Sequence, residues 1–531
     1  MRTLAGLGRL VRLALRRDRF RLPVWLVALG GTIVGSAASL PPVYPDQEAI
    51  DTYASLFGDN PALVAFAGPG HGFDDPNIGV ILVNEVQLWT CIGVALMSIF
   101  LVNRHTRQEE DEERTEVVRA NPVGRHAPTA AAVLVVAAAN VVLAAVCGVG
   151  FVALDYPVVG SLVLAASFAA CGLAFTGIAA VTAQLASTSR ASLAFSSVAL
   201  GAAFTLRAIG DISGSWHRWL SPIGWSQGVR AFADERWWPL AIAVAFTFAA
   251  VAGAFWLSTR RDLGSGILAP RPGPARAPRW AIRPEGLALR LQRGPLVAWM
   301  LGLFTIGALY GSIGQDVDEM IEENPTLAEF LAQLEGVDLA DAYFATTLVL
   351  QGLLAAGFTI SSVMRLRGEE VAGRADPVLG GPVSRWRWAA SHLAIAGFGT
   401  IAVVGAGGLG VGVAYAIVSG DAGEVVRLVG ASLVTVPAVL VLGGIAVALY
   451  GASPRLAAVA WAGLAAAVLV EFFGELLRLP GWLRAISPLY HLPGVPAEAL
   501  RPAPLLVLSA LAVALVAGGL ASFRRRDIAV R

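Results

Sequence analysis

Two short charged segments carry paired carboxylates and arginines in the same order. The shared residues are Glu109, Glu110, Arg114, Pro122 and Arg125 in the first segment, and Glu369, Glu370, Arg374, Pro382 and Arg385 in the second, at a constant offset of 260 residues. We call residues 109–125 and 369–385 the first and second charged loops. Acidic residues and arginines at corresponding positions of both segments suit docking to a partner protein. Plain solvated loops are the alternative, but membrane topology requires only the arginines and leaves the acids unexplained.

A second set of ionisable residues falls inside apolar stretches, where charge is costly and usually functional. Arg207 lies late in one stretch, and Glu471 and Glu475 lie late in another. An offset of 265 residues carries Arg207 onto Phe472, beside Glu471. We therefore predict an ion pair between Arg207 and Glu471 or Glu475. The alternative is that each side chain extends to the nearby membrane interface.

The other reactive residue types argue against catalysis in this chain. Lysine is absent, so no P-loop can form, and any ATP and Mg²⁺ would have to be bound by a partner. The cysteines and histidines show no metal-ligand spacing, so we predict no metal site and no cofactor. Residues 405–410 match G-x-G-x-x-G within an apolar stretch, which favours close helix packing. Acids at Asp74, Asp75 and between residues 316 and 341 are expected to be solvated, with cation binding as the alternative.

The elements that must position these residues are membrane-spanning helices. Of the 531 residues, 56% are hydrophobic and 15% charged, against about 45–50% and 25% in soluble domains. Long uncharged stretches recur, and the net charge of +1 provides no basic field for nucleic acid. We predict an all-α polytopic membrane protein with twelve transmembrane helices. The spans are residues 22–40, 79–102, 127–150, 157–183, 191–211, 239–258, 295–313, 342–364, 388–418, 424–450, 455–473 and 502–522.

The placement of arginine predicts the orientation. Seven arginines precede the first span and eight lie from Arg260 to Arg293, whereas residues 41–78 and 314–341 contain six and nine acids and no arginine. The positive-inside rule therefore places both termini and the central link in the cytoplasm. The first span resembles a signal peptide near Ser36, but its counterpart at residues 295–313 cannot be one, so a retained helix is expected.

An internal duplication organises the chain. Besides the charged loops, Ser221, Pro222 and Gly228 recur as Ser487, Pro488 and Gly494, and residues 260–262 (Arg-Arg-Asp) recur as residues 525–527. The chain therefore reads as two similar six-helix halves of the same orientation, related by an axis along the membrane normal. The predicted division is an interfacial helix (1–21), a first half (22–262), a linker with a second interfacial helix (263–294) and a second half (295–531).

Segments at the two membrane surfaces complete this organisation. Leu4, Leu7, Leu10 and Ala14 recur at helical spacing among arginines, which predicts an amphipathic helix at the cytoplasmic interface. On the outer side, the repeated Ser-Pro segments are predicted to be re-entrant or interfacial helices and are candidates for an external gate. Simple interfacial anchoring is the alternative for these outer segments.

Together, the two similar halves, the Arg-rich start, the E-E…R…P-V-x-R loop after each second span and the broken hairpin before each sixth resemble a known family. They are similar to permease subunits of bacterial ABC exporters, the polyketide-antibiotic type above all. The resemblance implies a plasma-membrane pump in which two copies of a separate ATP-binding-cassette ATPase dock on the charged loops as coupling helices. The copies depart from each other where Val117 stands opposite Pro377 and Glu113 opposite Gly373, so the docking sites are expected to be unequal.

We therefore expect a transport subunit, itself not an enzyme, that moves amphipathic or hydrophobic small molecules of antibiotic or drug type out of the cell. Apolar walls with few buried charges suit such cargo. The alternative is a secondary transporter with twelve spans driven by an ion gradient, which would need titratable groups near the midplane. A membrane-bound transferase would need clustered carboxylates or histidines at one membrane face, and the sequence has no such cluster.

Overall fold

The computed structural model describes residues 2–57, 64, 67–268, 276, 278–312, 339–473 and 479–526. Every regular element in these ranges is a helix, and eleven helices are long and apolar enough to cross a membrane. Eleven of the twelve predicted spans coincide with them. The predicted span at 455–473 is the exception, because its apolar helix, Leu456–Glu471, is shorter than a span. The chain is a multi-pass membrane protein.

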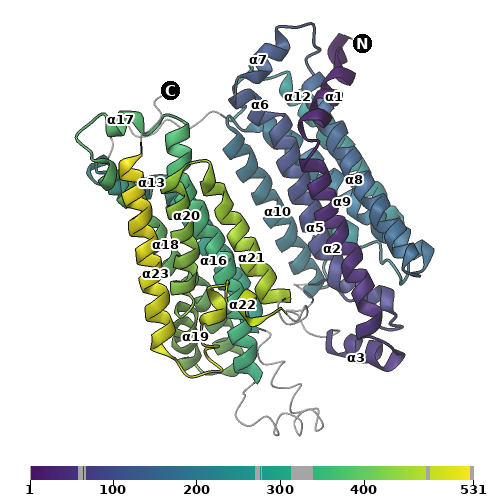
Figure 1. Cartoon of the computed structure of the whole chain (residues 1–531). Coiled ribbons are helices and arrows are strands. Elements are labelled where there is room, and N and C mark those ends of the chain that lie inside the picture. Colours follow the sequence, from purple (N-terminus) through teal and green to yellow (C-terminus); the bar gives the residue numbers. More distant parts are fainter. Residues whose placement is uncertain are drawn as a thin grey trace. The chain divides into compact units, whose positions relative to one another are not determined.

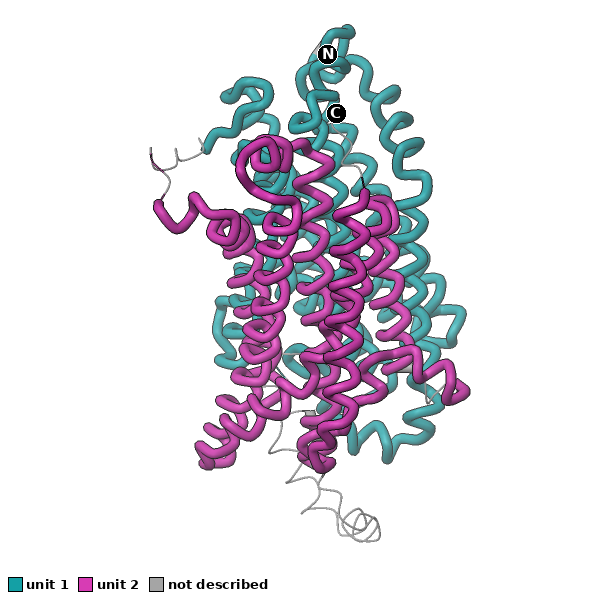
Figure 2. Tube along the Cα trace, turned by 60° about the vertical axis from the view of Figure 1, so that its left-hand side comes forward, with its two compact units in different colours: residues 1–273 teal, residues 274–531 magenta. Residues whose placement is uncertain are grey.

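The chain divides into two compact units, Met1–Gly273 and Pro274–Arg531, coloured separately in Figure 2. The division falls inside the predicted linker at 263–294. Each unit is a bundle of long helices with short helices at its ends (Figure 1).

Unit 1 contains six of the eleven candidate spans. Its helices are α1 (Leu7–Arg17), α2 (Arg21–Val43), α3 (Gln47–Phe57), α5 (Ile78–His105), α6 (Arg107–Asp111), α7 (Arg114–Arg119), α8 (Ala127–Ala153), α9 (Val158–Leu185), α10 (Ser189–Ile212), α11 (Pro222–Gln227) and α12 (Trp238–Ser258), with 3₁₀ turns at Arg2–Leu4 and Trp216–Leu220. Two of the long helices start at side-chain caps: Asn77 accepts from the backbone N–H groups of Gly79 and Val80, and Thr188 accepts from that of Ala191. These caps set the level at which α5 and α10 begin.

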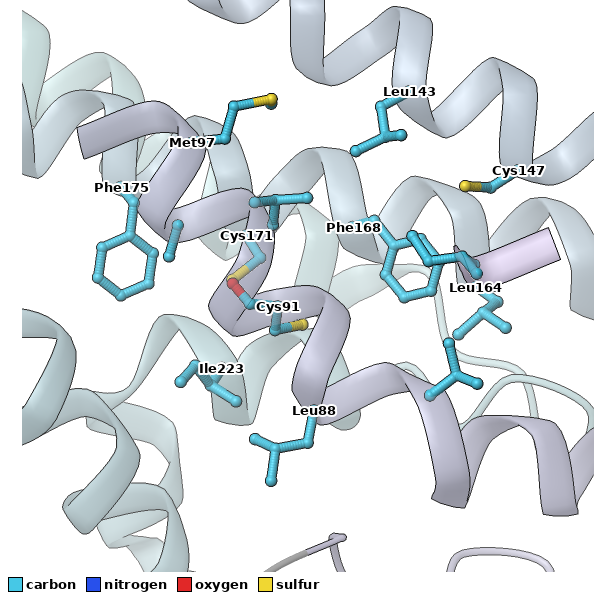
Figure 3. Packing of buried hydrophobic residues seen from close by; sticks show 14 of the residues in the cluster. Leu88, Cys91, Met97, Leu143, Cys147, Leu164, Phe168, Cys171, Phe175 and Ile223 are labelled. Carbon is cyan, nitrogen blue, oxygen red and sulfur yellow. The ribbon is translucent and has the colours of Figure 1, made fainter. Parts of the chain in front are cut away.

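The core of unit 1 lies around α9, which packs against α5, α8, α10 and α12. Figure 3 shows Phe168 and Cys171 of α9 among side chains from α5 and α8. All three cysteines, Cys91, Cys147 and Cys171, are free thiols buried in this core, in line with the absence of a disulfide pattern.

Unit 2 contains five candidate spans and the shorter apolar helix. One of these spans, Gly423–Ala452, consists of the two helices α19 and α20. Its helices are α13 (Pro284–Ser312), α16 (Leu339–Val371), α17 (Asp376–Leu379), α18 (Arg385–Ser419), α19 (Gly423–Leu433), α20 (Val436–Ala452), α21 (Ala460–Phe473), α22 (Gly481–Arg484) and α23 (Pro502–Arg525), with 3₁₀ turns at Arg279–Ile282, Leu456–Val459 and Leu489–His491. The long pairs α13 with α18 and α20 with α23 form its main contacts.

Glycines allow α13 and α18 to pack closely. A Cβ added to Gly410 would lie 2.1 Å from the Phe304 carbonyl oxygen, and one added to Gly307 would lie 2.3 Å from the Gly407 carbonyl oxygen. No larger residue fits at this crossing without separating the helices. The G-x-G-x-x-G run is therefore confirmed as helix packing inside α18 and not as a nucleotide loop.

Candidate functional site

The first charged loop folds as two short helices, α6 and α7, beyond the end of α5. The break between them falls at Glu113, whose φ of 59° is left-handed. In the second charged loop, Gly373 occupies the corresponding place with a φ of 68°. The two copies therefore share the same left-handed backbone turn although their residue types differ at this position. Glycine adopts this conformation at lower cost than glutamate.

Glu110 connects the first charged loop to the end of α12. Its two carboxylate oxygens accept hydrogen bonds from Arg261 Nη2 and Nη1 at 2.6 and 2.8 Å. Arg107, whose side chain is completely buried, also donates to Glu110 at 2.8 Å. Arg107 further donates through Nε and Nη2 to the Ala183 carbonyl at the end of α9. One carboxylate thus neutralises two buried guanidinium groups.

Glu370 makes the equivalent connection in the second unit. Its Oε2 accepts from Arg526 Nη2 at 2.8 Å, just after the end of α23. The Tyr450 hydroxyl of α20 donates to the same oxygen at 2.7 Å. We call the pairs Glu110–Arg261 and Glu370–Arg526 the two end clamps.

A second contact of each end clamp is repeated as well. Arg125 donates to the Arg261 carbonyl at 3.4 Å, and Arg385 donates to the Arg526 carbonyl at 3.1 Å. Arg125 also donates to the Ser258 carbonyl at 2.8 Å. Both ends of each charged loop are therefore attached to the segment that follows the last long helix of its own unit.

Glu109 and Glu369 hold the middle of each loop. Arg374 donates to Glu369 through Nε at 2.9 Å, and this hydrogen bond raises the pKa of Arg374. Arg114 lies 3.7 Å from Glu109, which accepts a shorter bond, 2.5 Å, from Arg17 of α1. The predicted loop residues therefore meet within their own loops, and in the first unit they also hold α1.

Asp18, at the junction of α1 and α2, is a member of this site that the sequence analysis missed. Its fully buried carboxylate accepts from Arg104 Nε at 2.8 Å and lies 2.5 Å from His105 Nε2. Burial alone would raise the pKa of Asp18, but the hydrogen bonds and charges of His105 and Arg104 outweigh it and lower that pKa. The available signal was a lone acid in an Arg-rich segment just before an apolar stretch.

Parts of both loops remain on the surface. Val117 of α7 is 70% exposed, and Val371 at the end of α16 is 54% exposed. Pro122 and Pro382 are exposed too, as are Arg114 and Arg374. The clamped carboxylates Glu110 and Glu370 keep only 9% and 7% of their side chains exposed, so the accessible surface consists of the loop residues between the clamps.

Two of the charged residues predicted within spans, Arg207 and Glu471, have partners in their own units. Arg207 Nη1 lies 3.6 Å from Asp211 one turn later and donates to the Val64 carbonyl at 3.1 Å. Glu471 accepts from the Ser487 hydroxyl at 2.7 Å. Glu475 lies outside the described residues. The ion pair predicted between the halves stays a prediction.

The repeated Ser-Pro segments differ between the units. Ser221 caps the buried helix α11 by accepting from the backbone N–H groups of Ile223 and Gly224, and Pro222 is its first residue. Gly228 ends α11 close to the Trp219 ring. In unit 2, Pro488 precedes only a 3₁₀ turn, and Gly494 accepts a backbone hydrogen bond from Glu498. A role of these six residues in an external gate remains a prediction.

Two comparisons with known proteins bear on this architecture. A family model described as the C-terminal domain of the multidrug efflux system permease Rv1217c matches residues 282–524. Over 523 residues, the chain is 36% identical to the multidrug efflux system permease protein Rv1217c of Mycobacterium tuberculosis strain ATCC 25618 / H37Rv. That alignment covers 98% of this chain and 94% of the relative, so the likeness includes both charged loops and both units. The chain belongs to the family of multidrug efflux system permeases that Rv1217c represents.

Proposed function

We propose that this chain is the transmembrane subunit of an ATP-driven exporter of amphipathic or hydrophobic drugs. Two copies of a separate ATP-binding-cassette ATPase dock on the two charged loops from the cytoplasm and bind the ATP and Mg²⁺. The chain sits in the bacterial plasma membrane with both termini in the cytoplasm. The arginines before the first span and after the sixth support this orientation.

The observation that carries the proposal is the pair of end clamps. An ATPase that pushes on a charged loop displaces a segment fastened to the end of α12 through Glu110–Arg261, or to the end of α23 through Glu370–Arg526. The buried contacts make each connection short and stiff. A clamp of this kind, present in both units, supports mechanical coupling from the loops to the long helices.

The exposed face of α7 is the proposed contact for the first ATPase copy. It combines the apolar Val117 with Glu116 and Arg119, both exposed. A central apolar group surrounded by charges is the composition of a specific protein interface. In unit 2, the exposed Val371, Arg374 and Pro377 form the corresponding surface, with fewer acids.

The test is drug-stimulated ATP hydrolysis by a candidate P-loop ATPase that is reconstituted in liposomes together with this chain. Val117→Asp should reduce both co-purification of the ATPase and stimulated hydrolysis about tenfold, since it places charge where an apolar contact is proposed. Trp482→Ala is the control, because Trp482 is 72% exposed in α22, at the end of unit 2 away from α17 (Figure 1). Uphill dye transport driven by an ion gradient alone would favour the secondary transporter instead.

A further inference from the structure

A polar cavity lies at the end of unit 1 where α7, the start of α8 and the ends of α9 and α12 meet. It occupies about 460 Å³, counting the part that is continuous with solvent. Its wall contains three arginines, Arg119, Arg125 and Arg261, against one carboxylate, Glu110. Other polar groups of the wall include the hydroxyls of Thr129 and Ser258 and the side chains of His105 and Gln184. The cavity therefore collects positive charge and hydrogen-bond donors.

The single carboxylate in the wall is already engaged. Glu110 accepts from Arg261 and from the buried Arg107 in the end clamp. Arg119 and Arg125 form no ion pair within the part of the chain that the structure describes, and their hydrogen bonds go to backbone carbonyls. A guanidinium group carries five N–H donors, so both retain donors for a ligand.

The neighbouring titratable groups respond to this excess of positive charge. Partial burial and the charges of Arg125 and Arg261 lower the pKa of Arg119, although Glu110 opposes the shift. Burial and the charges of Arg125 and Arg119 lower the pKa of His126, which precedes α8. An anion in the cavity would relieve this repulsion.

The corresponding place in unit 2 is filled with apolar side chains. The offsets of the duplication carry Arg119 onto Leu379, Thr129 onto Ala389 and Ser258 onto Phe523. These residues belong to or pack against one buried hydrophobic cluster with Leu366 and Ala375. Unit 2 keeps its end clamp with apolar residues at these three positions, so the polar residues that line the cavity in unit 1 are not required for the clamp.

We propose that this cavity binds a phosphate group, either of an anionic lipid headgroup or as inorganic phosphate. The space open to the centres of water molecules is about 30 Å³, which holds about two or three waters, because one needs roughly 10–15 Å³ on the same measure. That space suits a phosphate group and excludes a drug-sized molecule. Ser258 ends α12 and Ala127 begins α8, so the cavity lies at the level where lipid headgroups lie. The site does not depend on transport or on a partner ATPase.

The experiment uses the purified full-length chain, stripped of lipid, in neutral detergent without an ATPase. Native mass spectrometry measures binding of phosphatidylglycerol against phosphatidylcholine, and thermal unfolding measures stabilisation by phosphate against chloride at equal ionic strength. Arg119→Leu, which introduces the residue found in unit 2, should weaken anion binding about fivefold, the effect of losing one arginine near an anionic lipid. Arg119→Lys keeps the charge and should retain most of the affinity.

Arg385→Gln is the control, because it removes one arginine from the second charged loop, at the position that corresponds to Arg125, and it should leave anion binding to the cavity in unit 1 unchanged. Preference for phosphatidylglycerol without an effect of phosphate identifies a lipid headgroup, and stabilisation by phosphate shows that the free anion suffices. The proposal is overturned if the wild type discriminates neither pair of ligands, or if Arg119→Leu and Arg385→Gln weaken binding equally. Arg119 is exposed, so an unchanged unfolding temperature without ligand verifies that Arg119→Leu folds.

Discussion

Glu110 and Arg261 are separated by 151 residues and meet through two hydrogen bonds of 2.6 and 2.8 Å. Glu370 and Arg526 repeat this pair in the second unit with one hydrogen bond of 2.8 Å. The two end clamps differ in the additional group that binds the carboxylate. Glu110 also neutralises the buried Arg107, whereas Glu370 shares its oxygen with the Tyr450 hydroxyl.

Neutralising the two carboxylates should therefore have unequal effects on stability. Glu110→Gln leaves Arg107 and Arg261 buried without a counter-charge, and breaking such a buried pair costs about 3–5 kcal/mol. Glu370→Gln should cost less, about 1.5–3 kcal/mol, the range for a hydrogen bond to a charged group. Thermal unfolding in detergent measures both, with the exposed Glu112→Gln as control. Equal losses would contradict the role assigned to Arg107.

Charge reversal should be repaired in one unit only. In unit 2, Glu370→Arg combined with Arg526→Glu restores an ion pair, so the double variant should recover most of the stability that either single variant loses. In unit 1, the Glu110 carboxylate lies 2.8 Å from Arg107. Glu110→Arg combined with Arg261→Glu therefore places a new cation beside Arg107, and the double variant should not recover the lost stability. Double-mutant cycles by thermal unfolding measure the coupling. Recovery in both units would show that Arg107 is neutralised by another group.

Because each charged loop contains a left-handed turn, glycine and non-glycine substitutions at that turn should change the stability of the chain in opposite directions. Glu113 has a φ of 59°, which costs a non-glycine residue about 1–2 kcal/mol. Glu113→Gly should stabilise the chain by about 0.5–1 kcal/mol after the added flexibility of the unfolded chain is subtracted. Gly373→Ala should destabilise it by a similar amount, although the nearest atom to the new Cβ, Asp376 Oδ2, lies at an ordinary contact distance of 3.7 Å. Chemical denaturation of both variants is the measurement, and shifts of the same sign would refute the assignment.

Asp18 predicts a stability difference that depends on pH. Its pKa is lowered in the folded chain, so its stabilisation is complete above its ordinary value of about 4 and is lost as the pH falls through the lowered value. Asp18→Asn should destabilise the chain by about 1.5–3 kcal/mol at pH 7, the range for charged hydrogen bonds. The difference from wild type should shrink below about pH 4. Unfolding temperatures from pH 3 to pH 8 test this, and a difference independent of pH would contradict it.

The predicted ion pair between the halves remains open to a direct test. Arg207→Glu and Glu471→Arg should each reduce drug efflux, and the double reversal should restore it if the two side chains meet. The control is Arg207→Asp with Asp211→Arg, which swaps the charges of the pair observed in α10. Rescue by the control alone would show that Arg207 pairs with Asp211 in its own helix and would exclude Glu471 as its partner.

Much of the architecture could be predicted because its signals are local. Apolar length alone predicts a spanning helix, and eleven of the predicted spans coincide with candidate spans. The amphipathic start was predicted from helical spacing, and α1 occupies residues Leu7–Arg17. The weakest assignment was the span at 455–473, where the apolar composition continues but the chain forms a 3₁₀ turn and a short helix.

Three features follow from the amino-acid sequence without coordinates: the chain crosses a membrane many times, two charged loops repeat, and ATP cannot be bound through a P-loop lysine. Composition, spacing and residue counts suffice for these conclusions. The pairing of Glu110 with Arg261, the pairing of Glu370 with Arg526 and the burial of Asp18 became known from the folded chain. An ion pair depends on distance in space, and residues 151 positions apart meet only after the long helices between them have packed.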